Sequence, residues 1–325
     1  MSTSLAKNGY AFKRGLTDIG NGTFAWLQPD GSWGWSNSGL ITDGDQSLLV
    51  DTLFDLKLTR DMLAAMRDAA PKAAKQIGTL VNTHHNGDHC YGNELVEGAE
   101  IISSAHALEE MKRESPALIA NFMKAAPGMG LTGEYLMHCF GAFDFNGITP
   151  TLPTTTFTGR MTRKVGNKSV ELIEVGPAHT GGDVLVHVPA DRTVFTGDIL
   201  FVEGTPIMWA GPIGNWIAAC DMIASLDCET VVPGHGPVTD RRGVEAVRSY
   251  LTYIRDEARK RYDAGLSARD AAHDIALGDY DSWGDAERIA VNVASLYREF
   301  SGDATPPNPA ELFALMGEIW KKRRG

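Results

Sequence analysis

The chain has 325 residues, of which 43% are hydrophobic and 22% are charged, as in an ordinary soluble protein, and this length allows either one large α/β domain or a domain with an appended helical region. Its formal net charge of -11 disfavours a nucleic-acid partner, and the lack of an apolar run of about 18 residues excludes a membrane-spanning helix. Four scattered cysteines and an N-terminus without a signal-peptide core are typical of a cytoplasmic protein, so no membrane partner is expected.

The first part of the chain is predicted to form a meander of strands. Residues 16–51 alternate short apolar runs with turn signals, which is the pattern of neighbouring antiparallel strands. In this meander Trp33 and Trp35, two residues apart, would point to the same side of a strand. Asp51 follows a buried strand, where it either orients a metal-binding histidine from behind or caps the helix predicted over 56–70.

The segment 81–93, V-N-T-H-H-N-G-D-H-C-Y-G-N, holds three of the nine histidines. Its glycines break regular structure, so His84, Asp88 and His89 are predicted to lie on a loop that leaves the strand at 76–81. Imidazole nitrogens and carboxylate oxygens together suit zinc, iron or manganese. The segment therefore predicts a metal site.

Residues 115–150 differ from their surroundings in being rich in Met, Phe, Ala and Gly. The pattern predicts two short helices joined by a Pro-Gly break. These helices form either an apolar lid over a site, because adaptable methionine-rich surfaces suit hydrophobic ligands, or a hairpin that packs on the core. The sequence leaves both alternatives open.

A second strand-rich block follows over 151–196, and three further candidate ligands lie where strands end. His179 is on a Gly-rich loop, Asp198 comes just after a strand, and His235 follows the buried strand 230–232. Because the strand ends of one sheet system converge, these side chains are expected to meet the histidine cluster described above. The six ligands together suffice for two metal ions that share a carboxylate and a water.

The chain from 241 to 325 is predicted to be mostly helical and carries few residues with metal or catalytic chemistry. It forms an accessory region, which packs on the core, covers the mouth of the pocket or makes a homodimer. The domain boundary is therefore expected near 240, with residues 1–240 as the catalytic domain and 115–150 as an insertion in it.

Four motifs, in chain order, resemble those of the metallo-β-lactamase fold superfamily. H-H-N-G-D-H at 84–89 is similar to the family pattern H-x-H-x-D-H, and the other three are G-P-A-H-T-G-G-D, F-T-G-D-I-L and V-V-P-G-H-G-P. The resemblance implies an α/β fold, an αββα metallo-β-lactamase sandwich with a C-terminal helical extension. It also implies two ion sites that share Asp198, with His84 and His179 in the first, and Asp88, His89 and His235 in the second.

The chain departs from the family pattern at Asn86, which stands where the family has its second histidine. His85 is next to it but would have to point from the wrong side. An asparagine offers only a neutral amide oxygen, a weak ligand for zinc. The first site is then filled weakly, helped by Asn86 as a weak ligand, or left empty, so one or two ions are expected.

The resemblance implies a zinc-dependent hydrolase that uses a metal-activated water, with Asp88 holding this water and shuttling a proton. Iron or manganese could replace zinc. The small-molecule substrate would be an ester, lactone, thioester or amide. Five side chains suggest that this substrate is apolar or aromatic: Trp33, Trp35, Met208, Trp209 and Trp216.

Three other functions stay open. A single-iron dioxygenase acting on a thiol or persulfide uses a similar ligand set on this fold. A lyase, cyclase or dehalogenase would use the same Lewis acid without hydrolysis, and the unusual Asn86 makes this alternative less remote. A binding module with a decayed site is disfavoured, because random loss would rarely stop at one ligand.

Overall fold

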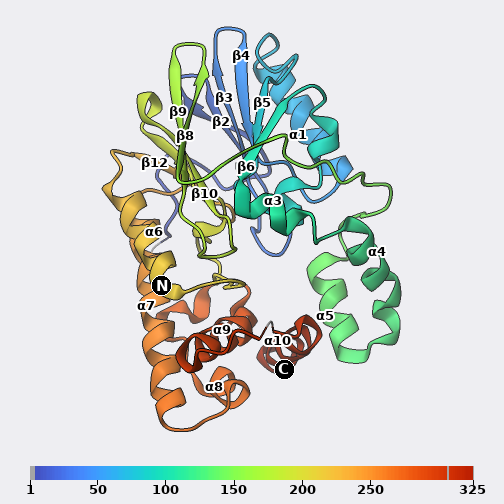
Figure 1. Ribbon diagram of the computed structural model, residues 1–325, viewed down its shortest axis with the longest axis vertical. Helices are drawn as coiled ribbons and strands as arrows, with labels where there is room; N and C mark the ends of the chain where they lie inside the picture. Colours follow the sequence, from blue (N-terminus) through green and yellow to red (C-terminus); the bar gives the residue numbers. More distant parts are fainter. Residues whose placement is uncertain (1–3, 306, 325) are drawn as a thin grey trace.

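The computed structural model describes residues 4–305 and 307–324. Two β-sheets lie face to face (Figure 1). The strands of the first sheet, in spatial order, are β1 (Gly15–Gly20), β2 (Thr23–Leu27), β3 (Ser38–Asp43), β4 (Gln46–Val50), β5 (Thr79–Val81), β6 (Glu100–Ser104) and β7 (Thr155–Phe157). This sheet is antiparallel from β1 to β4 and parallel from β4 to β7.

The strands of the second sheet, in spatial order, are β12 (Thr230–Val232), β11 (Thr193–Phe195), β10 (Val184–Val188), β9 (Lys168–Glu174) and β8 (Arg160–Val165). β11 and β12 are parallel, and the other neighbours are antiparallel. The parallel pairs matter for the site, because parallel strands deliver the residues that follow them to one edge of their sheet.

The buried side chains of β10 show how the layers are packed. Val184, Val186 and Val188 belong to the apolar cluster between the two sheets, whereas Leu185 between them belongs to a cluster shared with the helices outside. This alternation is the two-residue period of a strand. Both faces of the second sheet are therefore covered, which explains why the strand is apolar at almost every position.

The helices, in chain order, are α1 (Leu56–Ala69), α2 (Gly87–Cys90), α3 (Ala105–Met111), α4 (Pro116–Ala125), α5 (Gly130–Phe140), α6 (Ile213–Ser225), α7 (Arg241–Asp263), α8 (Ala268–Asp274), α9 (Ile289–Ser301) and α10 (Pro309–Arg324). α1 begins at Asp55, whose carboxylate accepts a hydrogen bond from the Leu58 N–H (2.7 Å), and it buries Met62 against the first sheet. α6 and α7 cover the second sheet. The predicted α/β class and αββα sandwich are confirmed.

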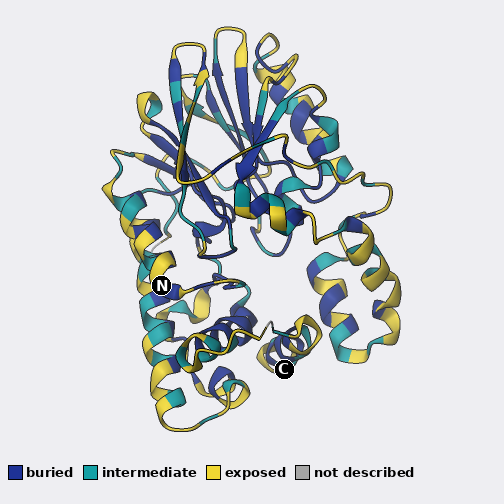
Figure 2. Ribbon diagram, viewed as in Figure 1, coloured by how far each residue is buried: buried dark blue, intermediate teal, exposed yellow. Residues whose placement is uncertain are grey.

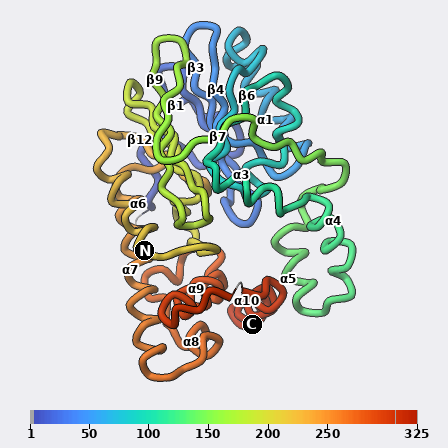
Figure 3. Tube along the Cα trace, in the orientation of Figure 1, coloured from blue at the N-terminus to red at the C-terminus, as the bar shows by residue number. Residues whose placement is uncertain are grey.

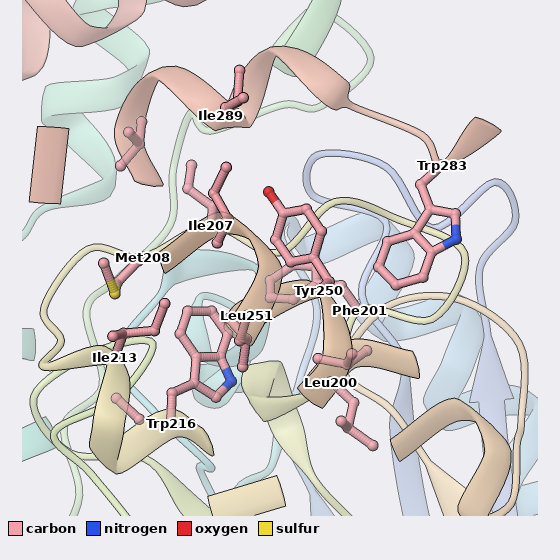
Figure 4. Packing of buried hydrophobic residues seen from close by; sticks show 14 of the residues in the cluster. Leu200, Phe201, Ile207, Met208, Ile213, Trp216, Tyr250, Leu251, Trp283 and Ile289 are labelled. Atoms are coloured by element: carbon pink, nitrogen blue, oxygen red, sulfur yellow. The ribbon is translucent and has the colours of Figure 1, made fainter. Parts of the chain in front are cut away.

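The helices α7 to α10 pack against the second-sheet side of the sandwich through one large apolar cluster. Figure 4 shows Trp216 of α6, Tyr250 of α7 and Ile289 of α9 meeting in this cluster. The opposite faces of these helices are exposed (Figure 2). The predicted C-terminal helical extension is confirmed. Across the described ranges, no helix combines the length and the apolar character needed to cross a bilayer.

The two helices predicted within 115–150 are α4 and α5, and they form a hairpin that lies beside α10 (Figures 1 and 3). The hydroxyl of Tyr135 on α5 donates a hydrogen bond to Glu287 (3.1 Å), just before α9. This buried bond ties the hairpin to the C-terminal helices. The hairpin, α10 and the sandwich all contribute side chains to the cavity at the candidate site.

Candidate metal centre

The candidate ligands all follow strands of the two sheets. His84 comes after β5, His179 lies between β9 and β10, Asp198 follows β11, and His235 follows β12. These strand ends meet at one edge of the sandwich, so the imidazoles of His84 and His235 both lie close to the Asp198 carboxylate, at 3.7 Å and 3.5 Å. Asp88 and His89 join them from the short helix α2.

The six predicted ligands fall into two groups, and within each group the ligand atoms lie within 4.8 Å of one another. The first group is His84, His179 and Asp198, and the second group is Asp88, His89 and His235. Asp198 lies between the groups, because its carboxylate is 3.4 Å from His179 Nε2 and 3.1 Å from His89 Nε2. This arrangement suits two cations that share one carboxylate.

Hydrogen bonds on the outer side of the cluster fix how the imidazoles point. The Nδ1 atoms of His179 and His235 lie 2.6 Å and 3.0 Å from the carbonyl oxygens of Ile207 and Gly31. A carbonyl oxygen can only accept, so each Nδ1 carries the proton and donates. Nε2 is therefore the ring nitrogen that faces the centre in both residues, and it would bind a metal in its deprotonated form.

The centre of the cluster has buried polar atoms without partners. Among the described residues, His84 Nε2, His89 Nε2 and Asp198 Oδ1 are buried and make no hydrogen bond. Leaving such atoms unpaired is costly, and native structures rarely do so without a water or an ion. The donor set of four imidazoles and two carboxylates matches what zinc prefers. The residues present therefore fit a metal ion.

One glycine allows the last loop to approach the cluster. Gly234, in the P-G-H-G motif, packs so closely on Asp198 that a Cβ atom there would lie 2.0 Å from its Oδ1. A larger residue would have to displace the carboxylate or the His235 loop.

Burial and the nearby carboxylates have opposite effects on the pKa values of the histidines. Burial lowers the pKa of His84, and it lowers the pKa of His179 to about 4, so both are neutral near pH 7. Burial acts the same way on His235, but Asp198 and a second carboxylate outweigh it and raise its pKa to about 9. The negative carboxylates thus stabilise positive charge in the cluster. A divalent cation would supply this charge in place of the protons on the histidines.

Asn86 and His85 take different directions. Asn86 Oδ1 lies 2.8 Å from His179 Nε2, so the amide reaches the first group. His85 instead lies between Glu110 (3.1 Å) and Glu114 (3.2 Å). Burial lowers the pKa of His85, but the two glutamates outweigh it and raise the pKa to about 10. Of these two neighbours, Asn86 is the one that faces the first group.

The cluster opens into a cavity of about 320 Å³, called the metal pocket below. Asp88, Asp198, His179 and His235 form its polar floor, and tryptophan and phenylalanine side chains form part of its walls. The side chain of Asp88 is 13% exposed, whereas that of His89 is fully buried. Asp88 and Asp198 both line the metal pocket, and Asp88 is the more exposed of these two carboxylates because the Asp198 side chain is only 4% exposed.

Two of the five predicted pocket residues, Trp33 and Trp209, line the metal pocket. The prediction for the other three needs correction. Met208 and Trp216 are 2% and 0% exposed within the core cluster (Figure 4), because α9 packs on the Met208 segment and Trp216 points inward from α6. Trp35 packs on Phe143 (4.7 Å between ring centroids), since its segment is a loop rather than a strand.

Some wall residues come from parts of the sequence without a motif. Arg288 and Phe313 reach the metal pocket from the C-terminal helical region, and Phe140 reaches it from α5. Arg288 is 2% exposed; its guanidinium lies over the ring of Trp33 (4.5 Å) and pairs with Asp285 (3.0 Å). No local pattern could have identified these residues, because only the packing of distant helices brings them to the site.

Asp183, at the end of H-T-G-G-D, holds the His179 loop and was not singled out from the sequence. Its carboxylate accepts hydrogen bonds from the Thr180 hydroxyl (2.6 Å) and backbone N–H (3.0 Å). Burial raises its pKa to about 7 despite these bonds. The folded state therefore binds this proton more tightly than the unfolded chain does, and the stabilisation is lost as pH rises from about 4 to about 7.

Asp183→Asn is expected to remove that dependence. With a chelator present to remove metal, the unfolding free energy of wild type should fall relative to that of the variant as the pH rises from 4 to 8. The expected relative loss is a few kcal/mol, so the variant is favoured at high pH. Urea unfolding at each pH measures it. Parallel pH profiles for the two proteins would contradict the assigned pKa.

A family model described as the metallo-beta-lactamase superfamily matches residues 31–235. The chain is 22% identical over 218 residues to the beta-lactamase-like protein 2 homolog of Caenorhabditis elegans, covering 67% of this chain and 61% of that protein. It is 26% identical over 172 residues to a hydroxyacylglutathione hydrolase of Rhizobium meliloti (strain 1021), covering 52% of each.

Among solved structures, the stereoselective inverting sec-alkylsulfatase Pisa1 from Pseudomonas sp. superposes with a TM-score of 0.67 at 17% identity, covering 92% of this chain and 52% of that one. The chain thus spans less than two thirds of the length of each of these three relatives. The family model covers more than half of the chain and includes all six ligands of the two groups. The chain belongs to the metallo-beta-lactamase superfamily.

Proposed function

We propose that the protein is a zinc-dependent hydrolase of a small ester, thioester, lactone or amide. The observation that carries this proposal is the convergence of four imidazole Nε2 atoms and two carboxylates, partly unpaired, on the floor of an apolar pocket. The superfamily is hydrolase-like, and one relative is named for the hydrolysis of hydroxyacylglutathione. The substrate itself is not fixed by that relative.

The two groups would each hold one ion, with Asp198 shared. Zinc at such a centre would supply a Lewis acid that lowers the pKa of bound water toward about 7 and polarises a carbonyl. Within the chain, Asp88 holds the attacking water from the pocket side and accepts its proton. The apolar walls around it, including Trp33 and Trp209, exclude bulk water and orient the substrate.

The first test is hydrolysis itself. Cleavage of a thioester or ester in water labelled with heavy oxygen is expected to place the label in the acid product, and chelation should abolish the reaction. An unlabelled product would favour a lyase, cyclase or dehalogenase instead.

The second test addresses Asn86. Because an amide replaces an imidazole in the first group, wild type is expected to keep about one zinc per chain after dialysis, and Asn86→His about two. Elemental analysis measures both, with Asn167→His on an exposed turn as the control. Tight binding of both ions in wild type would contradict a weak first site, iron would favour a dioxygenase, and absence of metal would overturn the proposal.

We also propose residues 1–240 as the catalytic domain and 241–325 as an accessory region that closes the metal pocket. The contribution of Arg288 and Phe313 to the pocket walls supports that role. The cytoplasmic location and the homodimer through the C-terminal helices stay predictions.

A further inference from the structure

A second cavity, of about 270 Å³, lies between the α4–α5 hairpin and the start of α10. We call it the apolar branch. Its wall is made mainly of aliphatic and aromatic side chains: Leu118, Phe122, Met123, Met129 and Leu136. The branch belongs to neither of the two metal-ligand groups.

The apolar branch shares part of its lining with the metal pocket. The two cavities share five lining residues: Glu114, Ile119, Phe140, Pro309 and Phe313. Phe140 stands at this junction, with its ring centroid 5.6 Å from that of Trp33 in the metal pocket and 6.0 Å from that of Phe313. The apolar branch is therefore the neighbouring space into which an apolar group of a molecule at the metal centre would extend.

The outer end of the branch is also apolar. Leu118 and Phe122 line it and are 53% and 47% exposed. Exposed apolar patches on soluble proteins commonly mark binding grooves or protein interfaces. A second protein copy would explain the exposed apolar rim, but it would not explain a cavity that shares five lining residues with the metal pocket.

We propose that the apolar branch binds a flexible aliphatic chain of the substrate whose reacting group sits at the metal centre. The proposal rests on the hydrolase function proposed above and narrows it to esters or thioesters of aliphatic acids or alcohols. Each methylene that leaves water is worth about 0.8 kcal/mol, so affinity should rise about fourfold per methylene until the branch is full.

The expected result is a chain-length profile that depends on the branch. For nitrophenyl esters from acetate to decanoate, kcat/KM of wild type should rise about fourfold per methylene and then level off. Met123→Trp fills the branch without touching the metal pocket. It should leave the acetate ester within about twofold of wild type and lower kcat/KM for the decanoate ester at least about tenfold.

Two further variants test whether the effect of Met123→Trp comes from filling the apolar branch. Asn121→Trp places the same ring on the exposed side of α4, outside both cavities, and should behave as wild type. Leu118→Trp, at the half-exposed rim, gives a second obstruction at a position where unfolding is not expected. Identical chain-length profiles in wild type, Met123→Trp and Leu118→Trp, or equal losses for short and long esters, would overturn the proposal.

A binding assay separates this proposal from the hydrolase proposal. Decanoate is expected to displace anilinonaphthalene sulfonate from the purified protein, butanoate much less, and Met123→Trp should remove the difference. If no ester is cleaved but this pattern holds, the hydrolase fails and the branch stands. If decanoate and butanoate compete equally in wild type, the aliphatic-chain site is wrong even in an active hydrolase.

Discussion

Asp88→Asn is expected to lower kcat by about 10² to 10⁴, the range for loss of a general acid–base group, while the protein stays folded. The reason is its position, because Asp88 is the more exposed of the two cluster carboxylates that line the metal pocket, and its Oδ2 lies 3.2 Å from His235 Nε2. An asparagine there keeps the size and one ligand oxygen, but it cannot accept the proton of water at neutral pH.

Steady-state kinetics at saturating zinc separate lost catalysis from lost metal. Asp45→Asn, on the exposed turn between β3 and β4, makes the same chemical change away from the site and should keep full activity. A kcat for Asp88→Asn within about fivefold of wild type, with zinc bound, would mean that another group accepts the proton.

The strands and the ligands could be predicted because each motif joins a residue type to the end of a strand. The helix expected over 56–70 is α1 (Leu56–Ala69), and the strand expected at 76–81 contains β5 (Thr79–Val81). Period and turn residues are local properties, so the sequence carries them. That His84 and His235 both approach Asp198 follows from the parallel strands that precede them.

The pocket walls could not be predicted in the same way. Trp33 and Trp35 were expected on one side of a strand, yet they lie on a loop, where Trp33 turns to Phe140 and Trp35 to Phe143. The wall also needs Phe313, which follows the first motif by more than 200 residues. Such contacts depend on how helices pack, and spacing along the chain does not encode them.

The orientation of the Asn86 side chain could be predicted only in part from the sequence. The motif alone identified the departure from the family pattern, but not whether the amide would face the cluster. The structure places its Oδ1 beside His179 Nε2, because His85 is held aside by two glutamates. An ion pair formed by residues 25 to 29 positions away thus decides which side chain faces the first group.

Asp51→Asn is expected to weaken zinc binding by about 10- to 100-fold with little loss of stability. The buried carboxylate of Asp51 accepts hydrogen bonds from the Thr83 N–H and hydroxyl (both 2.7 Å) and lies 2.9 Å from His89 Nδ1. A carboxylate requires a proton on His89 Nδ1, so Nε2 keeps its lone pair for the metal. An amide N–H facing Nδ1 would reverse the tautomer and put a proton on Nε2, which points at Asp198 (3.1 Å).

Asp51→Ala distinguishes tautomer control from simple packing. It removes the acceptor of buried donors at Thr83, so it should also lower the unfolding free energy by about 1–3 kcal/mol, whereas Asp51→Asn should not. Asp55→Asn, another buried carboxylate, serves as the control because it caps α1 and makes no contact with a histidine of the cluster. Zinc titration measures the affinity. Wild-type affinity in a folded Asp51→Asn protein would reduce Asp51 to a structural link between β4 and β5, since the proton on His89 would then be set by the cluster itself.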